Sequence, residues 1–180
     1  PLVMSLHGAG GAGTRGIRRL MPLADAAGLI LLAPDSRDSS WDAIRGGFGP
    51  DTDFIDKALT RVFDRYAIDP ARVSVEGFSD GASYALSIGL GNGDLFGRII
   101  AFSPGFIIPT AHVGKPLIFQ SHGTADEILP IDRCSRVIVP ELKQAGYNVH
   151  YREFDGPHAA PPDIVKEAVA WLQADKKSGR

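Results

Sequence analysis

Short apolar runs alternate with amphipathic helical patterns along the whole chain. Two segments, 54–66 between the runs and 164–172 after the last one, place apolar residues at a period near 3.6 and predict helices. Further helices are expected over about 15–27, 80–90 and 132–145. The apolar runs predict six strands, at Leu2–Leu6, Leu29–Ala33, Arg72–Val75, Arg98–Phe102, Pro116–Gln120 and Tyr147–Phe154.

Strands that alternate with helices favour a parallel sheet covered on both faces. We therefore expect a three-layer α/β/α sandwich with a mostly parallel open sheet. The chain has 180 residues, of which 44% are hydrophobic and 22% charged, which suits one globular domain over 1–180. Residues 175–180, Asp-Lys-Lys-Ser-Gly-Arg, are expected to form a frayed, solvated tail. In such sheets the loops at the carboxyl ends of the strands carry the chemistry.

Charge and cysteine content exclude several classes of function. The 19 basic and 21 acidic side chains give a net charge of −2 without long blocks of one sign, which argues against nucleic-acid binding. No apolar run is long enough for a membrane span, and the N-terminus lacks the pattern of a signal peptide. The single cysteine, Cys134, suits a reducing compartment, so we expect a cytoplasmic location. A homo-oligomer is left open.

No cofactor and no metal ion is expected. Asp51, Asp53 and Asp56 could suggest a cation site, but acidic residues at the start of a helix complement its dipole. We interpret these three carboxylates in that way.

The stretch V-S-V-E-G-F-S-D-G-A-S passes from a strand to a helix through a turn with almost no loop. Such a sharp turn exposes its central residue, Ser79, and crowds its neighbours, which accounts for Gly77 and Gly81. The turn also directs the backbone N–H of Asp80 towards charge that develops at the serine, as one half of an oxyanion hole. We interpret Ser79 as a nucleophile; the alternative is a glycine-rich turn with a capping serine.

A serine nucleophile needs a histidine base and a carboxylate that orients it. His158 lies in D-G-P-H, after the last predicted strand, and Asp126 lies in H-G-T-A-D, after the preceding one. The order Ser79, Asp126, His158 is the one that a serine hydrolase of this architecture requires. His7 and His122, each before a glycine at a strand end, are expected to form hydrogen bonds within their loops.

The loop His-Gly-Ala-Gly-Gly at residues 7–11 is expected to supply the second oxyanion donor, from the N–H of Ala9 or alternatively Gly10. Nucleotide binding is the rival interpretation of this loop. It fits poorly, because the loop lacks the Lys-Ser/Thr pair of a P-loop and the spacing of a dinucleotide-binding motif.

Substrate contacts are expected from two further segments. The 36–50 segment is too long to be only a connector, and Trp41 is interpreted as an apolar wall of the site, with packing as the alternative. Phe106 and Ile107 are candidates for an acyl pocket, with core filling as the alternative. The connection from Phe102 to Pro116 is too short for a cap, so an open site is expected.

These motifs together resemble the α/β-hydrolase superfamily, and most closely its phospholipase/carboxylesterase branch of serine esterases and acyl thioesterases. The matching pieces are L-H-G-A-G-G, L-L-A-P-D-S-R, S-W-D, G-F-S-D-G-A-S, H-G-T-A-D with I-L-P, and G-P-H. The resemblance implies a triad of Ser79, Asp126 and His158, oxyanion N–H groups from Ala9 and Asp80, and cleavage of carboxylic esters or thioesters through an acyl-enzyme.

The chain departs from the family pattern in three places. Members commonly carry Gln where Asp80 stands and Gly where Pro157 stands, which leaves the substrate preference open. The family sheet usually begins with strands before the L-H-G strand, and these are absent here. Either the chain is trimmed or the sheet is reduced to about six strands, with Leu29–Ala33 at an edge.

Two other functions stay open at this point. The same triad could serve a polymer or feruloyl esterase, or a peptidase-like relative. From a different class, the chain could be a catalytically silent hydrolase-fold protein that binds a ligand, since it is short and carries the unusual Asp80.

Overall fold

A computed structural model of the chain describes residues 1–174, so the expected tail from residue 175 lies outside the described residues. One sheet contains six strands, and every neighbouring pair is parallel. The spatial order is β2-β1-β3-β4-β5-β6. The strands are β1 (Leu2–Leu6), β2 (Ile30–Leu32), β3 (Val73–Phe78), β4 (Arg98–Phe102), β5 (Leu117–Gly123) and β6 (Val149–Phe154).

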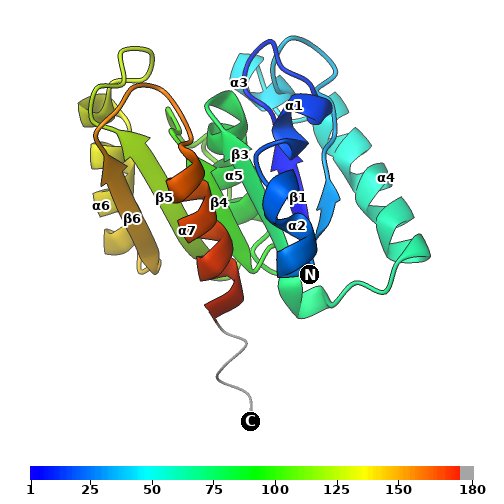
Figure 1. The fold of residues 1–180 in the computed structure, drawn as a ribbon. Helices are drawn as coiled ribbons and strands as arrows, with labels where there is room; N and C mark the ends of the chain where they lie inside the picture. Colours follow the sequence, from blue (N-terminus) through cyan, green and yellow to red (C-terminus); the bar gives the residue numbers. More distant parts are fainter. Residues whose placement is uncertain (175–180) are drawn as a thin grey trace.

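Helices cover both faces of this sheet (Figure 1). The helices are α1 (Gly13–Ile17), α2 (Met21–Ala27), α3 (Asp42–Arg45), α4 (Pro50–Arg65), α5 (Asp80–Gly91), α6 (Ser135–Gln144) and α7 (Pro162–Gln173). Helices α2 and α7 lie in front of the sheet in Figure 1, and α5 lies behind it. None of the helices within residues 1–174 is long and apolar enough to cross a bilayer.

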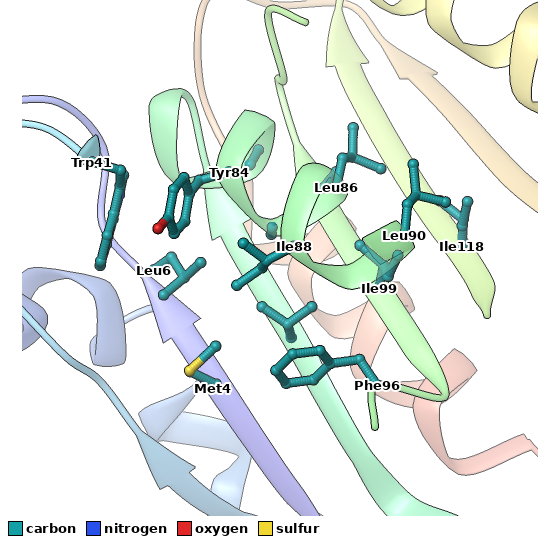
Figure 2. Close-up of a cluster of buried hydrophobic side chains, with 14 of the residues drawn as sticks. Met4, Leu6, Trp41, Tyr84, Leu86, Ile88, Leu90, Phe96, Ile99 and Ile118 are labelled. Carbon is teal, nitrogen blue, oxygen red and sulfur yellow. The ribbon is translucent and has the colours of Figure 1, made fainter. Parts of the chain in front are cut away.

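The core is divided between the two faces because successive side chains of a strand point to opposite sides. Met4 and Ile99 join the larger apolar cluster, which includes side chains of α4, α5 and α6 (Figure 2). Val3 and Ile100, one residue away on the same strands, join the second cluster with α2 and α7. The expected three-layer α/β/α sandwich is therefore confirmed.

Most predicted elements have the expected positions, and the differences have local causes. β4 is found as predicted, and β2 lies at the edge of the sheet. The single helix expected over 15–27 is two helices, since Pro22 lies at the start of α2 and cannot continue a preceding helix. β3 and β5 run on through Phe78 and Gly123, past their predicted ends, and α3 was not predicted.

A buried ion pair lies directly before the strand-to-helix turn. Glu76, in β3, is completely buried and accepts hydrogen bonds from the Ser5 hydroxyl and the Arg19 guanidinium, the latter at 3.3 Å. Arg19 also donates to the carbonyl of Leu6 at 3.0 Å. Burial raises the pKa of Glu76, and Arg19 opposes that rise. The pair joins the segment before α2 to the two central strands that lead into the site.

Candidate active site

Ser79 lies at the sharp turn between β3 and α5. Its φ of 58° and ψ of −122° are strained for a residue with a side chain. The flanking glycines are required by close backbone contacts: a Cβ on Gly77 would overlap the carbonyl of Gly81, and a Cβ on Gly81 would overlap the carbonyl of Leu6. The backbone N–H of Ser79 donates to the carbonyl of Phe102 at 3.0 Å, which ties the turn to β4.

The structure brings together the three side chains that the sequence singled out. The Nε2 atom of His158 lies 2.9 Å from the Oγ atom of Ser79. The Nδ1 atom of the same ring lies 2.6 Å from the Oδ2 atom of Asp126. The imidazole can therefore accept the serine proton through Nε2 while Nδ1–H donates to the carboxylate.

Neighbouring groups hold the loop and ring of His158. The ring packs against Phe78 with 4.8 Å between the ring centroids. Ser103, itself in a left-handed conformation with φ of 52°, donates from its hydroxyl to the carbonyl of Ala159 at 3.1 Å. The loop that carries His158 is thereby fastened to the end of β4.

Asp126 is held as a carboxylate although it is buried. Burial favours its neutral form, but the backbone N–H of Leu129 and the His158 ring outweigh that effect and lower the pKa of Asp126. Its Oδ1 atom accepts the N–H groups of Ile128 at 3.0 Å and Leu129 at 2.8 Å. Its Oδ2 atom is left to face His158.

The backbone N–H groups that are expected to bind an oxyanion differ in whether they already donate a hydrogen bond. The N–H of Gly10 donates to the carbonyl of Ser39 at 2.6 Å, so the alternative donor is already engaged. The N–H groups of Ala9 and Asp80 have no acceptor within residues 1–174. Gly8, beside Ala9, packs so closely that a Cβ there would lie 3.3 Å from the Cβ of Ser79. The first-strand loop thus lies against the turn.

An open cleft of about 280 Å³ lies over these groups. Its lining includes Gly8 and Ala9 of the loop after β1, together with Ser79, Ile128 and His158. It lies where the order of the strands reverses around β1, at the carboxyl ends of β1 and β3, which is the usual location of sites in open parallel sheets. A larger hollow, of about 430 Å³, lies by Phe63, Tyr66 and Leu95, near the opposite end of β3, and contains none of these groups.

Trp41 does not form a wall of this cleft, contrary to the expectation. The indole is completely buried and its ring is stacked on Tyr84 of α5, with 5.1 Å between centroids (Figure 2). Its Nε1–H donates to the carbonyl of His7 at 2.9 Å. The packing alternative is the correct one, because an aromatic ring with a buried polar partner for its N–H suits a core position.

Phe106 and Ile107 are also not among the residues that line the cleft. Ile107 is partly buried against the larger core cluster, and 41% of Phe106 is exposed. The backbone N–H groups of Gly105 and Phe106 face the hydroxyl of Ser83 on α5, at 2.9 and 3.4 Å. The segment after β4 therefore packs on α5.

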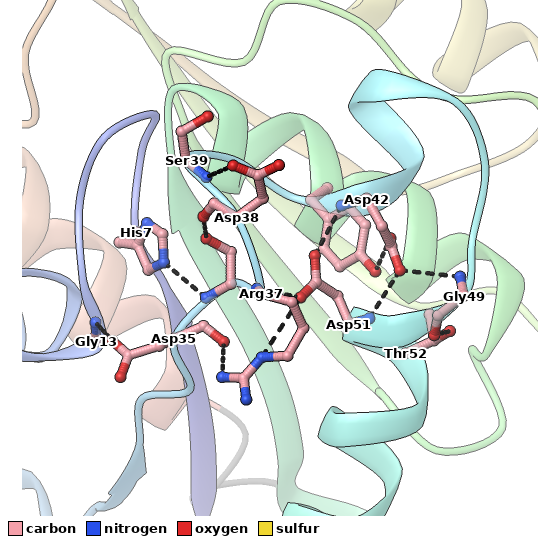
Figure 3. A network of polar contacts seen from close by, with 12 residues as sticks. His7, Gly13, Asp35, Arg37, Asp38, Ser39, Asp42, Gly49, Asp51 and Thr52 are labelled. Atoms are coloured by element: carbon pink, nitrogen blue, oxygen red, sulfur yellow. Dashed lines mark hydrogen bonds and ion pairs between the residues drawn. The ribbon is translucent and has the colours of Figure 1, made fainter.

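Two aspartates close the 36–50 segment, because the carboxylate of each accepts the backbone N–H of the other (Figure 3). The N–H of Asp42 donates to Asp51 at 2.7 Å, and the N–H of Asp51 donates to Asp42 at 2.8 Å. Asp42 also accepts from the Tyr84 hydroxyl at 2.9 Å, and burial together with this carboxylate raises the pKa of Tyr84. Asp51 is only 1% exposed, so it does more than complement a helix dipole.

The closed 36–50 segment supports both proposed oxyanion loops. Ser36 donates its N–H to the His7 ring at 3.0 Å, which is the dashed line at His7 in Figure 3. The Ser39 carbonyl accepts from the N–H of Gly10 at 2.6 Å. The Ser40 hydroxyl donates to the Asp80 carboxylate at 2.6 Å. The sequence indicated that this segment was more than a connector, but no local pattern pointed to serines that hold the residues around Ala9 and Asp80.

Within residues 1–174, no group of three or more His, Cys, Asp or Glu side chains is placed to hold an ion. Cys134 is buried, and burial raises the pKa of its thiol.

Comparison with known proteins finds a matching family and several similar sequences for this chain. Residues 36–175 match the Phospholipase/Carboxylesterase family. Acyl-protein thioesterase 1 of Eremothecium gossypii is 30% identical over 113 residues, which are 58% of this chain and 48% of that protein. Acyl-protein thioesterase 1 of Gibberella zeae is 28% identical over 116 residues, 59% of this chain and 49% of that protein. The chain spans about half the length of these curated relatives.

Solved structures extend the likeness to nearly the whole chain. The crystal structure of esterase PE8 has a TM-score of 0.82 and 25% identity, and the match covers 96% of this chain and 91% of that one. The crystal structure of SOBER1 from Arabidopsis thaliana has a TM-score of 0.73 and 19% identity, covering 98% of this chain and 99% of that one. The latter likeness concerns the fold alone.

Proposed function

The chain belongs to the phospholipase/carboxylesterase family of α/β-hydrolases, and from that premise we propose that it is a serine hydrolase that cleaves carboxylic esters or thioesters. One observation carries the proposal: Ser79, His158 and Asp126 form a continuous hydrogen-bonded series, with distances of 2.9 Å and 2.6 Å, at a strained turn beside an open cleft.

In the proposed reaction the Ser79 Oγ atom attacks the substrate carbonyl carbon while His158 Nε2 takes the hydroxyl proton. The resulting oxyanion is stabilised by the N–H groups of Ala9 and Asp80. His158 then returns the proton to the alcohol or thiol as the bond to it breaks, which leaves an acyl-serine. Water, deprotonated by the same imidazole, attacks the acyl-serine and releases the acid. Asp126 keeps the proton on Nδ1 and stabilises the imidazolium.

The proposal is tested by hydrolysis of p-nitrophenyl acetate and of an acyl thioester by the wild type, Ser79→Ala and His158→Ala. Each variant should lose at least about 10⁴-fold in kcat, because removal of a triad member leaves only binding and oxyanion stabilisation. His150→Ala is the matched control, since His150 is half-exposed, pairs with Glu167 and stacks on Phe119, and is not among the residues that line the cleft. Turnover that does not depend on Ser79 would reject the proposal.

The same assay separates the other functions that the sequence left open. A feruloyl ester and a peptide are added to the substrates to distinguish an esterase from its polymer-directed and peptidase-like relatives. A wild-type protein that hydrolyses none of them, although it is folded, would favour the catalytically silent binding protein.

A further inference from the structure

A second histidine contacts the carboxylate of the proposed triad. The Nε2 atom of His122 lies 3.1 Å from the Oδ2 atom of Asp126, the same oxygen that faces His158. His122 is completely buried at the end of β5, and His158, not His122, contacts Ser79. The triad needs only one imidazole, so the presence of the second one requires a reason.

The hydrogen bonds around His122 determine which nitrogen carries its proton. Nε2 faces two acceptors, the Leu129 carbonyl at 2.7 Å and the Asp126 carboxylate. Nδ1 faces the Ser135 hydroxyl at 2.7 Å, and that hydroxyl also accepts from the Gln120 amide at 2.7 Å. An unprotonated ring nitrogen cannot donate a hydrogen bond to an acceptor, so the proton is assigned to Nε2. Nδ1 is then unprotonated and accepts a hydrogen bond from the Ser135 hydroxyl.

His122 therefore donates its Nε2–H to the Leu129 carbonyl, and the same edge of the ring lies 3.1 Å from the Asp126 carboxylate. Burial lowers the pKa of His122, although the Leu129 carbonyl and Asp126 favour its charged form. The other ionisable groups that act on this ring are His158 and, from β6, Glu153. Asp126 then receives three hydrogen bonds, two from backbone N–H groups on Oδ1 and one from His158 on Oδ2, and the polar edge of His122 also lies beside Oδ2.

We propose that His122 is a positioning residue for catalysis, which fixes Oδ2 of Asp126 opposite His158 and limits the negative charge that His158 meets. This role rests on the proposed function of the triad. Removing the Nε2–H that faces Leu129 and Asp126 should leave Asp126 less well oriented and more basic.

The test compares His122→Gln with His122→Asn. The Gln amide can reach the position of Nε2, where it donates to the Leu129 carbonyl beside Asp126, whereas the shorter Asn amide reaches only the position of Nδ1 and Ser135. We expect H122Q to keep kcat within about threefold and H122N to lose about 10- to 100-fold in kcat at an unchanged KM. In H122N the acid limb of the kcat/KM profile should also move to higher pH, because a more basic carboxylate stabilises the imidazolium of His158.

Equal kcat values and pH profiles for the two variants would overturn the positioning role. If H122N does not fold, His122→Ser replaces it, since a serine hydroxyl is too short to reach the position of Nε2, and an unchanged kcat in that variant would have the same meaning. Dependence of the wild type on Ser79 is measured in parallel. If that dependence is absent, the proposed function itself fails; if it is present and H122N behaves as wild type, only the role of His122 fails.

A separate observation concerns the charge of the cleft. Arg15, exposed in the last turn of α1, lines the cleft that holds Ser79 and His158. Its guanidinium has no hydrogen-bonding or ion-pair partner among residues 1–174, whereas that of Arg19 is engaged by Glu76 and Leu6. No carboxylate of the described chain lines this cleft. The cleft therefore offers one unpaired guanidinium to a substrate.

We infer that Arg15 selects esters that carry an anionic group, a carboxylate or a phosphate, apart from the bond that is cleaved. This inference also rests on the proposed function. A guanidinium binds either anion through paired N–H donors. Arg18 provides a matched control, because it lines the neighbouring hollow of about 390 Å³ and not the cleft with Ser79.

The test measures kcat/KM of the wild type, Arg15→Gln and Arg18→Gln on two substrate pairs. One pair is mono-p-nitrophenyl succinate and p-nitrophenyl butyrate; the other is a monoacylglycerol phosphate and the matching monoacylglycerol. We expect the wild type to prefer the anionic member of at least one pair about tenfold, and only R15Q to lose that preference. The substrate pair in which R15Q loses the preference shows whether Arg15 recognises a carboxylate or a phosphate. No preference in the wild type, or equal loss in R18Q, would overturn the inference, while turnover of the neutral esters would still support the hydrolase.

Discussion

Replacing Asp51 by asparagine tests how the 36–50 segment is held. Both oxygens of this carboxylate accept backbone N–H groups, of Arg37 at 2.6 Å and of Asp42 at 2.7 Å. Asparagine keeps one acceptor and turns an NH₂ group towards the other amide, which is left unsatisfied in a buried position. A buried hydrogen bond to a charged group contributes about 1.5–3 kcal/mol, so we expect D51N to lower the free energy of unfolding by about 2–3 kcal/mol.

Asp53 is the matched control, since it lies in the same first turn of α4 but is exposed. For a chain of this length 1 kcal/mol corresponds to about 2–4 °C, so the thermal unfolding temperature should fall by about 4–12 °C in D51N. In D53N only a helix-dipole contribution of about 0.3–1 kcal/mol is lost, or at most about 4 °C. Both are measured by circular dichroism at equal protein concentration.

The activity of D51N tests whether the segment supports the oxyanion loops. Ser39 and Ser40 contact Gly10 and Asp80, so loosening the segment should lower kcat more than it raises KM. Equal unfolding temperatures for D51N and D53N would refute the reasoning, because the carboxylate of Asp51 would then act only through the helix dipole.

Three further predictions concern single side chains near the site. Asp80→Asn should keep kcat/KM within about threefold for p-nitrophenyl acetate, because the proposed oxyanion donor is its backbone N–H; a loss above about 100-fold would contradict this. Trp41→Phe should destabilise the fold by about 1–3 kcal/mol in urea unfolding, through the unsatisfied His7 carbonyl, yet leave the acyl-chain preference unchanged; an altered preference would count against a core role. Since the pKa of Asp126 is lowered below its ordinary value of 3.8, its stabilising contribution is present above that value and is lost as pH falls through the lower folded pKa. Thermal unfolding below about pH 4 should therefore depend on pH less steeply in Asp126→Asn than in the wild type, and equal slopes would argue against it.

The fold was predictable because its strands are apolar runs separated by helical patterns. Arg98–Phe102 is a run of this kind, and its bounds were found as predicted. The ends of β3 and β5 were missed because Glu76 and His122 are polar and look like loop residues. Each is buried in the sheet only because a distant side chain, Arg19 for one and Ser135 for the other, satisfies it.

The candidate site was predictable as far as local turn chemistry extends. The Gly-x-Ser-x-Gly turn and the positions of Asp126 and His158 at strand ends follow from spacing. Trp41 was misplaced because the sequence does not reveal that Tyr84 and the His7 carbonyl lie beside it. For the same reason the contact of His122 with Asp126 could not be found, although the two residues are only four positions apart.

Labelling with a fluorophosphonate probe, followed by mass spectrometry of the digested protein, tests the central claim most directly. Such a probe reacts with a serine hydroxyl that an adjacent imidazole activates. The account predicts a single adduct on Ser79 in the wild type and its loss in His158→Ala, whose fold is retained. An adduct on another residue, or none on the folded wild-type protein, would contradict it.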